Sequence, residues 1–190
     1  MEMDFDWSEF ALIRADEWIG DQALVPEAAT GVYAILMRNA EPILEVSGHF
    51  ELGGRPPARI DNYVHMYSGA SFDLRKRLKS HILGTVRTST LRKSLLAIDS
   101  YYSGWEPFVI GCDGQWDDMT LDNWIAAHSL IAFRPADDAL MAEQCLLRAT
   151  ASPLNISLRR TDAYARRLTA LRCMLDRKPI PLCCADAAFK

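Results

Sequence analysis

The chain has 190 residues, of which 49% are hydrophobic and 24% are charged, and its formal net charge is -4. These proportions are ordinary for a globular protein, and the length allows one domain with a substantial core. No apolar run approaches the ~20 residues that span a bilayer, and the N-terminus is acidic where a signal peptide would be basic. We therefore expect a cytoplasmic protein that does not contact membranes.

The charge is unevenly distributed along the chain. Residues 1–30 hold eight acidic residues and one basic residue, whereas residues 71–98 hold seven basic residues and one acidic residue. A second basic stretch covers residues 157–178. Because the local field steers a polyanion, two basic stretches on an acidic chain are compatible with DNA binding. Solvated helix faces explain the charge equally well.

The predicted elements begin with an acidic lead-in, residues 1–30, which we expect to be irregular or helical and packed on the core. Gly31 opens a compact apolar segment, GVYAILM, which is typical of a strand. Residues 41–62 contain a segment that could form a strand or hairpin, and then a loop rich in glycine and proline. The alternating pattern from Tyr63 to Tyr67 predicts a second strand.

Helical patterns occupy much of the remaining chain. A helix is predicted from Asp73, which with Ser71 is a candidate N-cap, because apolar residues recur every four positions after it. A third strand is expected at residues 105–110. Further helices are expected at residues 89–98, 121–129, 138–150 and 161–177. This order predicts an α/β sandwich in which helices flank a short, mainly antiparallel sheet of three strands.

The helix that begins at Asp73 places two polar residues beside its apolar stripe. At about 100° per residue, Arg77 and His81 lie one turn apart on the same flank. An arginine in this position can offer a planar, permanently charged fork to a phosphate. The alternative is an arginine that extends to solvent beside a histidine bonded to an amide group.

A carboxylate lies on the predicted inward face of the helix at residues 138–150. Glu143 shares this face with Leu140, Leu147 and Thr150. An ionised carboxylate is rarely buried without a partner, because desolvation is costly. A divalent cation is one suitable partner, since Mg²⁺ commonly uses one or two carboxylates together with water and phosphate oxygens. A salt bridge to an arginine and exposure at the helix edge are the alternatives.

Two tyrosines lie next to glycines at the ends of predicted strands, Tyr33 after Gly31 and Tyr67 before Gly69. A glycine there lets the backbone approach a ligand closely. Because a phenol has an ordinary pKa of about 10, it can act as a base only where positive charge lowers that pKa. A metal ion and the two basic residues of the following helix could supply this charge.

The combined pattern resembles the GIY-YIG nuclease family. Members of this family carry a Gly-x-Tyr strand and a Tyr-x-Gly strand, followed by a helix with an arginine and often a histidine one turn later. The chain has six residues at these spacings: Gly31, Tyr33, Tyr67, Gly69, Arg77 and His81. The family's metal-binding glutamate lies on a later helix and precedes a proline and an asparagine. Three residues look like this group: Glu143, Pro153 and Asn155.

The resemblance covers residues 31–156 and implies a small GIY-YIG-like sandwich with endonuclease activity. The expected reaction is hydrolysis of DNA phosphodiester bonds with one divalent cation, Mg²⁺ or Mn²⁺. Residues 41–62 look inserted, because the step from Tyr33 to Tyr67 is longer than the family's usual interval. They could form a substrate-recognition loop. Residues 157–190 are expected to form a C-terminal basic helix and tail.

The resemblance also implies a role for each matching residue. Tyr33 would activate the attacking water, and Tyr67 would hydrogen-bond at the phosphate. Arg77 would stabilise charge on the phosphoryl oxygens, and Glu143 would hold the metal. His81 would assist proton transfer or orient Tyr33. Three residues would support the site structurally: Gly31, Gly69 and Asn155.

Basic residues outside the motif are candidates for contacts with DNA phosphates, which position a protein on the duplex without reading its sequence. They are Arg75, Lys79, Arg87, Arg92, Lys93 and the arginines between residues 159 and 172, including Arg159 and Arg160.

Several functions remain open. The compact chain and the long insert lean towards a restriction or defence nuclease, with a repair or structure-specific nuclease as the alternative. A non-catalytic nucleic-acid-binding module on the same scaffold is a second class, although the joint presence of Tyr33, Tyr67, Arg77 and Glu143 argues against it. A protein-interaction domain is a third class, because the amphipathic segment at residues 164–175 could form a homodimer face or pack within the fold.

Overall fold

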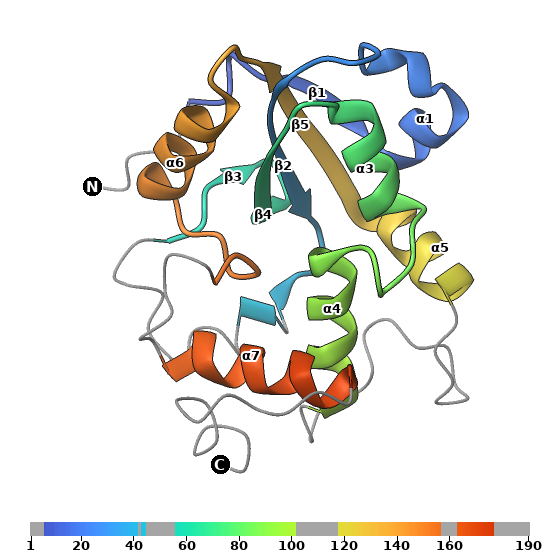
Figure 1. Cartoon of the computed structure of the whole chain (residues 1–190), viewed down its shortest axis with the longest axis vertical. Helices are drawn as coiled ribbons and strands as arrows, with labels where there is room; N and C mark the ends of the chain where they lie inside the picture. Colours follow the sequence, from blue (N-terminus) through green and yellow to red (C-terminus); the bar gives the residue numbers. More distant parts are fainter. Residues whose placement is uncertain (1–5, 42, 45–55, 102–117, 157–162, 177–190) are drawn as a thin grey trace.

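The computed structural model describes residues 6–41, 43–44, 56–101, 118–156 and 163–176. Its sheet has the strand order β1-β5-β2-β4-β3, and each neighbouring pair is antiparallel. Figure 1 shows the strands side by side with helices packed around them. The strands are β1 (Ala11–Arg14), β2 (Gly31–Met37), β3 (Arg59–Ile60), β4 (Tyr63–Ser71) and β5 (Ser129–Pro135).

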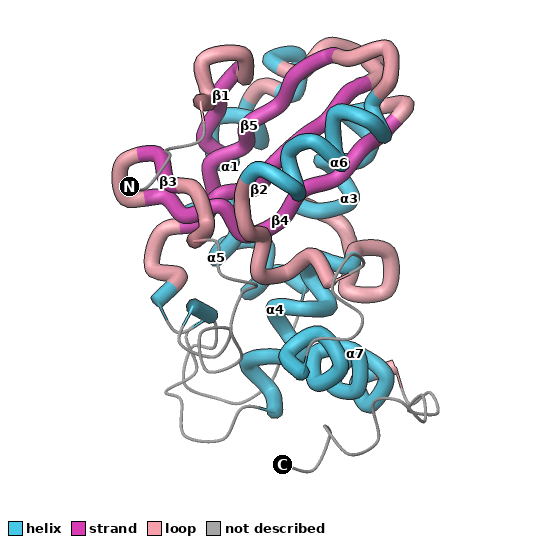
Figure 2. The backbone as a smooth tube through the Cα atoms, turned by 90° about the vertical axis from the view of Figure 1, so that its left-hand side faces the viewer, coloured by secondary structure: helices cyan, strands magenta, loops and turns pink. Residues whose placement is uncertain are grey.

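The helices lie on both faces of this sheet. α6 covers one face, as Figure 2 shows, and the other helices lie on the opposite face or beyond the end of the sheet. The helices are α1 (Ala15–Gly20), α3 (Leu74–Ile82), α4 (Thr90–Tyr101), α5 (Asp118–His128), α6 (Ala139–Ala149) and α7 (Ala163–Leu175), with a short 3-10 turn η1 (Gln22–Leu24). No helix in the described part of the chain is both long and apolar enough to span a membrane.

The α/β class with a mainly antiparallel sheet is confirmed, but the expectation of three strands is wrong because the sheet has five. β1 lies within the lead-in that we expected to be irregular or helical. β5 follows α5 without a break and lies between β1 and β2, where its apolar residues are buried on both faces of the sheet. The expected strand at residues 105–110 lies outside the described residues. Residues 41, 43 and 44 are helical, so the suggested strand or hairpin does not begin there.

β2 separates two apolar clusters because its side chains alternate between the two faces of the sheet. Three residues face the larger cluster: Tyr33, Ile35 and Met37. Three residues face the smaller cluster, against which α6 packs: Val32, Ala34 and Leu36. Tyr33 therefore points towards the face that carries α3.

An irregularity in the ladder between β2 and β4 determines where the β4 side chains point. Tyr67 lies opposite Ile35, but the next residue of β2, Leu36, lies opposite His65. The extra residue, Met66, makes a bulge, and bulges often redirect side chains next to functional sites. Tyr67 consequently belongs to the larger cluster, whereas the ring of His65 packs edge-on against that of Trp7 with the centroids 5.6 Å apart.

The helix after β4 forms as the sequence predicts. Asp73 caps α3 by accepting a hydrogen bond from the Lys76 N–H at 2.9 Å. The three apolar residues of its stripe are fully buried: Leu74, Leu78 and Ile82. Helix α7 also packs inward, with three of its apolar residues at most 2% exposed: Tyr164, Leu168 and Leu171. Of the two alternatives for this segment, the structure supports packing within the fold, because these residues lie in the larger cluster.

Candidate active site

The two tyrosines meet two polar residues of α3 on one face of the sheet. The Oη atom of Tyr33 lies 2.6 Å from Nε2 of His81, and Nε of Arg77 donates to the same hydroxyl at 3.2 Å. The ring centroids of Tyr67 and His81 are 5.1 Å apart, and those of the two tyrosines are 6.4 Å apart. The structure thus brings four of the expected site residues into one cluster.

Both motif glycines lie where neighbouring atoms leave no room for a Cβ atom. A Cβ atom at Gly31 would lie 2.3 Å from the carbonyl oxygen of Arg134 on the neighbouring strand β5. A Cβ atom at Gly69 would lie at the same distance from the hydroxyl oxygen of Tyr33. Gly31 therefore allows the close packing of β2 on β5, and Gly69 leaves the space that the Tyr33 side chain occupies.

His81 has a second partner that sequence reasoning missed. The Oγ atom of Ser89 lies 2.7 Å from Nδ1 of His81, and it also accepts a hydrogen bond from the Arg92 N–H at 3.2 Å. Ser89 therefore caps the start of α4 and orients the imidazole ring. The only signal in the sequence is a serine at the start of a predicted helix, which is an ordinary N-cap pattern and does not point to His81.

Burial keeps both phenols protonated. Tyr33 is fully buried and Tyr67 is 6% exposed. Burial raises the pKa of both hydroxyls above the ordinary value, and the charge of Arg77 opposes this only in part. Burial, followed by the charges of Arg77 and Arg92, lowers the pKa of His81 to about 3. Arg77 lowers the pKa of Tyr33 as expected, but burial outweighs it. The expectation that His81 adds a positive charge is wrong, because its lowered pKa leaves the ring neutral at pH 7.

Glu143 reaches the cluster from the opposite face of the sheet. It lies on α6, which packs against β2 and β4 on that face. Burial raises the pKa of Glu143, while the backbone of Ala70 and the charge of Arg77 lower it. The carboxylate therefore lies near enough to Ala70 and Arg77 for both to affect its pKa.

The inward face of α6 is rotated by about one residue from the predicted one. Leu140 is 61% exposed, whereas three neighbouring positions are buried against the sheet: Ala139, Ala142 and Leu146. Alanines let the helix approach the sheet closely, so the longer Leu140 is left outside. Glu143 lies beside this buried face and is half-buried. Within the described residues it forms no ion pair with an arginine, so that alternative is not supported.

Asn155 bonds to the backbone of β4 next to Tyr67. Its Oδ1 accepts from the Ser68 N–H at 2.6 Å, and its Nδ2 donates to the Ser68 carbonyl at 2.9 Å. The hydroxyl of Ser152 donates to the same Oδ1 at 2.6 Å. The amide takes the place of a neighbouring strand where β3 does not cover β4, and it satisfies backbone groups that would be costly to leave unpaired.

Glu143 has the chemistry to bind a divalent cation beside the tyrosines. Among the residues that the structure describes, no group of three or more His, Cys, Asp or Glu side chains is arranged for a metal. One half-buried carboxylate without an ion pair nevertheless suits Mg²⁺, which binds one or two carboxylates and completes its shell with waters and phosphate oxygens. Glu143 therefore fits the metal ligand that the resemblance implies.

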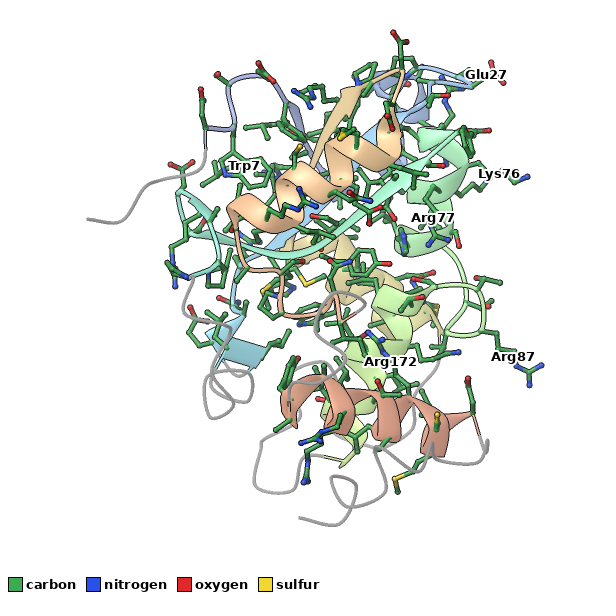
Figure 3. The ribbon with its side chains drawn as sticks, turned by 60° about the vertical axis from the view of Figure 1, so that its left-hand side comes forward. Trp7, Glu27, Lys76, Arg77, Arg87 and Arg172 are labelled. Carbon is green, nitrogen blue, oxygen red and sulfur yellow. The ribbon has the colours of Figure 1, made fainter. Side chains whose placement is uncertain are left out.

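Some of the basic residues expected to contact DNA are accessible. Lys79 and Arg87 are exposed, and Arg87 points away from the ribbon in Figure 3. Arg75 is partly exposed, and its Nε donates to the Val25 carbonyl at 2.9 Å. Two further candidates lie outside the described residues: Arg159 and Arg160.

Two other candidates are bound within the fold. Arg92 is fully buried and forms an ion pair with Asp122 at 2.6 Å. Lys93 forms an ion pair with Asp176 at 2.8 Å, which links α4 to the residue after α7. The expectation that Arg92 contacts DNA is wrong, because its side chain is fully buried. A DNA contact by Lys93, which is partly exposed, stays a prediction.

Comparison with known proteins gives one family match. A family model described as GIY-YIG catalytic domain matches residues 31–174. This range begins at Gly31, includes every residue of the cluster and extends through most of α7. No curated protein and no solved structure matches the chain significantly. Because the family model covers well over half of its residues, the chain belongs to the GIY-YIG catalytic domain family.

Proposed function

We propose that the protein is a metal-dependent endonuclease that hydrolyses phosphodiester bonds in DNA. Membership of the GIY-YIG family supports an endonuclease-type enzyme. The observation that carries the proposal is the hydrogen bond between Tyr33 and His81, with Arg77 on the same hydroxyl and the Glu143 carboxylate near enough for Arg77 to affect its pKa. This set combines a proton acceptor, a phosphate-binding cation and a metal ligand.

Tyr33 would pass a proton to His81 while it takes one from the attacking water. The hydroxyl is protonated in the free protein, so it can accept a proton only if its own proton leaves. His81 is neutral and lies 2.6 Å away. In the tautomer with its proton on Nδ1, His81 donates to Ser89 and accepts the Tyr33 proton on Nε2. The water oxygen then bonds to phosphorus, and His81 becomes an imidazolium.

Arg77 and Tyr67 would hold the phosphate during attack. Arg77 is partly exposed, and no ion pair with the described residues occupies its guanidinium. The guanidinium suits phosphoryl oxygens, because the planar fork of arginine matches their geometry. Tyr67 retains its proton and can donate a hydrogen bond to the same group.

Glu143 would hold the divalent cation, Mg²⁺ or Mn²⁺. When bound, such a cation polarises the phosphate and stabilises the leaving oxygen. The bond between phosphorus and this oxygen breaks, and the oxygen takes a proton from solvent. Asn155 would hold the β4 backbone beside Tyr67 in place.

The DNA would lie over the exposed basic residues that follow the tyrosines, including Lys79 and Arg87. Since phosphate contacts release counterions, binding should weaken steeply with rising salt. The long step from Tyr33 to Tyr67 supports a nuclease that recognises a site, in restriction or defence. Repair of branched DNA is the competing use of the same chemistry.

Incubation of the purified protein with supercoiled plasmid and with branched DNA tests the proposal. Nicking or linearisation is expected with Mg²⁺ or Mn²⁺, and EDTA should abolish it. Preference for the branched substrate would favour a repair function over restriction or defence. Salt-sensitive DNA binding without cleavage in either metal would instead indicate a non-catalytic binding module.

A further inference from the structure

Arg172 of α7 is a cation without a carboxylate partner beside the tyrosine cluster. Its Nη2 donates to the carbonyl of Leu154 at 3.0 Å, and its Nε donates to Oγ of Ser94 at 3.1 Å. It forms no ion pair with any carboxylate in the described residues. Figure 3 shows its side chain pointing from α7 towards the sheet.

Leu154 connects this guanidinium to the strand that carries Tyr67. The N–H of Leu154 donates to the carbonyl of Met66, the residue before Tyr67, at 2.9 Å. The charge of Arg172 acts on the Tyr67 hydroxyl and lowers its pKa against the larger effect of burial. Arg77 acts on the same hydroxyl in the same direction. Two arginines from different helices therefore approach Tyr67.

The surroundings of Arg172 differ from those of the other inward basic residues. Arg92 and Lys93 each have a carboxylate at ion-pair distance. Burial lowers the pKa of Arg172, and the groups that oppose this effect are two tyrosines and a cysteine, with no carboxylate among them. A cation withdrawn from water is costly unless an anion accompanies it. The fold thus holds a positive charge near enough to Tyr67 to affect its pKa, and no carboxylate of the described residues pairs with it.

The guanidinium is also held in position before any ligand arrives. Ser94 and Leu154 bind Nε and Nη2, while no hydrogen bond joins Nη1 to a described residue. We propose that Arg172 binds a non-bridging oxygen of the DNA phosphate at Tyr67, as a second arginine that complements Arg77. This inference rests on the proposed nuclease function and adds a phosphate-binding residue to it.

A thermal-shift titration with inorganic phosphate at constant ionic strength tests the binding part. Arg172→Met removes the charge and keeps the apolar stem, and Arg148→Ala removes a charge from an exposed arginine of α6 as the matched control. Phosphate should raise the Tm of the wild type and of Arg148→Ala, and it should raise the Tm of Arg172→Met clearly less, because Arg77 alone remains to bind it. An equal rise in Arg172→Met, or no rise in the wild type, would overturn the proposal.

Plasmid cleavage under single-turnover conditions tests the same residue in the reaction. The rate should fall about 10²-fold in Arg172→Met, the loss typical of one donor to a developing oxyanion. Arg172→Lys retains the charge but lacks the planar fork, so it should cleave at an intermediate rate. It replaces Arg172→Met as the test variant if Arg172→Met does not fold. Wild-type rates in these two variants would overturn the inference and leave the nuclease function intact. A smaller phosphate shift in Arg172→Met than in the wild type, with no cleavage by the wild type, would reject the nuclease and retain the phosphate site.

Discussion

Gly69 lies directly across the β2–β4 ladder from Tyr33, and the tyrosine hydroxyl fills the space that a side chain at residue 69 would need. A Cβ atom there would lie 2.3 Å from Oη and 2.6 Å from Cζ of Tyr33. Tyr33 is fully buried and bonded to His81, so its ring cannot swing aside freely. The glycine of the second motif is thus a steric requirement of the tyrosine in the first.

Gly69→Ala should impair both stability and cleavage. The added methyl group should lower the free energy of unfolding by about 1–3 kcal/mol, the usual cost of overpacking a core. It should also slow plasmid cleavage by about 10²-fold, since a displacement of about 1 Å at a reacting group has this effect. Urea unfolding and single-turnover assays measure the two quantities.

Gly20→Ala is the matched control, because nothing lies within 4 Å of a Cβ atom at that position. It should change neither the unfolding free energy nor the cleavage rate appreciably. Wild-type cleavage by a folded Gly69→Ala variant would show that the position of the Tyr33 hydroxyl is not critical.

Arg77→Ala should remove phosphate stabilisation without unfolding the protein. Arg77 is partly exposed, and its loss leaves no described carboxylate without an ion-pair partner. The cleavage rate should fall by about 10²–10³-fold. Lys76→Ala, one residue earlier on α3, removes a charge that points to solvent and should retain nearly full activity. Equal rates in the two variants would remove Arg77 from the mechanism.

The local sequence pattern predicts some of the helices and strands but not others. α3 combines a capping Asp73 with apolar residues every four positions, so its boundaries and its buried stripe follow from the sequence. β5 is harder to predict from the sequence. A central strand that is buried on both faces appears as a short apolar run, and periodicity cannot distinguish such a run from the end of a helix. β5 also follows α5 without a loop, so no turn residues mark the boundary between the helix and the strand.

The residues of the candidate site also differ in how far the sequence predicts them. Tyr33, Tyr67, Arg77 and His81 belong to a motif of fixed spacing, so the sequence alone identifies them. Ser89 is not identifiable in this way, because its contact with His81 depends on how the chain turns between α3 and α4. The pattern of leucines predicts the wrong face of α6, because alanine and not Leu140 packs closest to the sheet.

Glu143→Gln tests the metal ligand with almost no change of shape. It should abolish the metal-dependent part of cleavage and remove any heat of Mn²⁺ binding measured by isothermal titration. Stability at neutral pH should hold or rise slightly, since burial already opposes the charged form of Glu143. Asp137→Asn, which removes an exposed carboxylate just before α6, should leave Mn²⁺ binding intact. Unchanged Mn²⁺ binding by Glu143→Gln would show that Glu143 is not the metal ligand.

Acid should destabilise the fold through two buried histidines. Burial is the largest cause that lowers the pKa of both His65 and His81, from the ordinary 6.5 to about 3. Between these values the unfolded chain binds protons that the folded state does not, so stability falls as pH decreases through this window and is fully present above it. The slope should be about 1.4 kcal/mol per pH unit for each histidine.

Urea unfolding at pH 7 and pH 5 measures this slope. His65→Asn removes one of the two titrating groups, and it lies on the face of the sheet opposite the tyrosines. The variant should lose less stability than the wild type between the two pH values, whatever its stability at pH 7. An unchanged difference would mean that His65 takes up its proton in the folded state as readily as in the unfolded chain.

Ser89→Ala tests whether the orientation of His81 contributes to the reaction. The substitution removes the cap of α4, which should lower the free energy of unfolding by about 1 kcal/mol, and it leaves Nδ1 of His81 without its acceptor. Cleavage should slow by about 10-fold or more, as part of the 10²–10⁴-fold that general acid–base catalysis contributes. Asp21→Ala removes a comparable cap from η1 and should lower stability without slowing cleavage. Ser89→Thr keeps a hydroxyl at this position and should cleave at the wild-type rate. A wild-type rate in Ser89→Ala would show that Ser89 only caps the helix and does not contribute to the reaction.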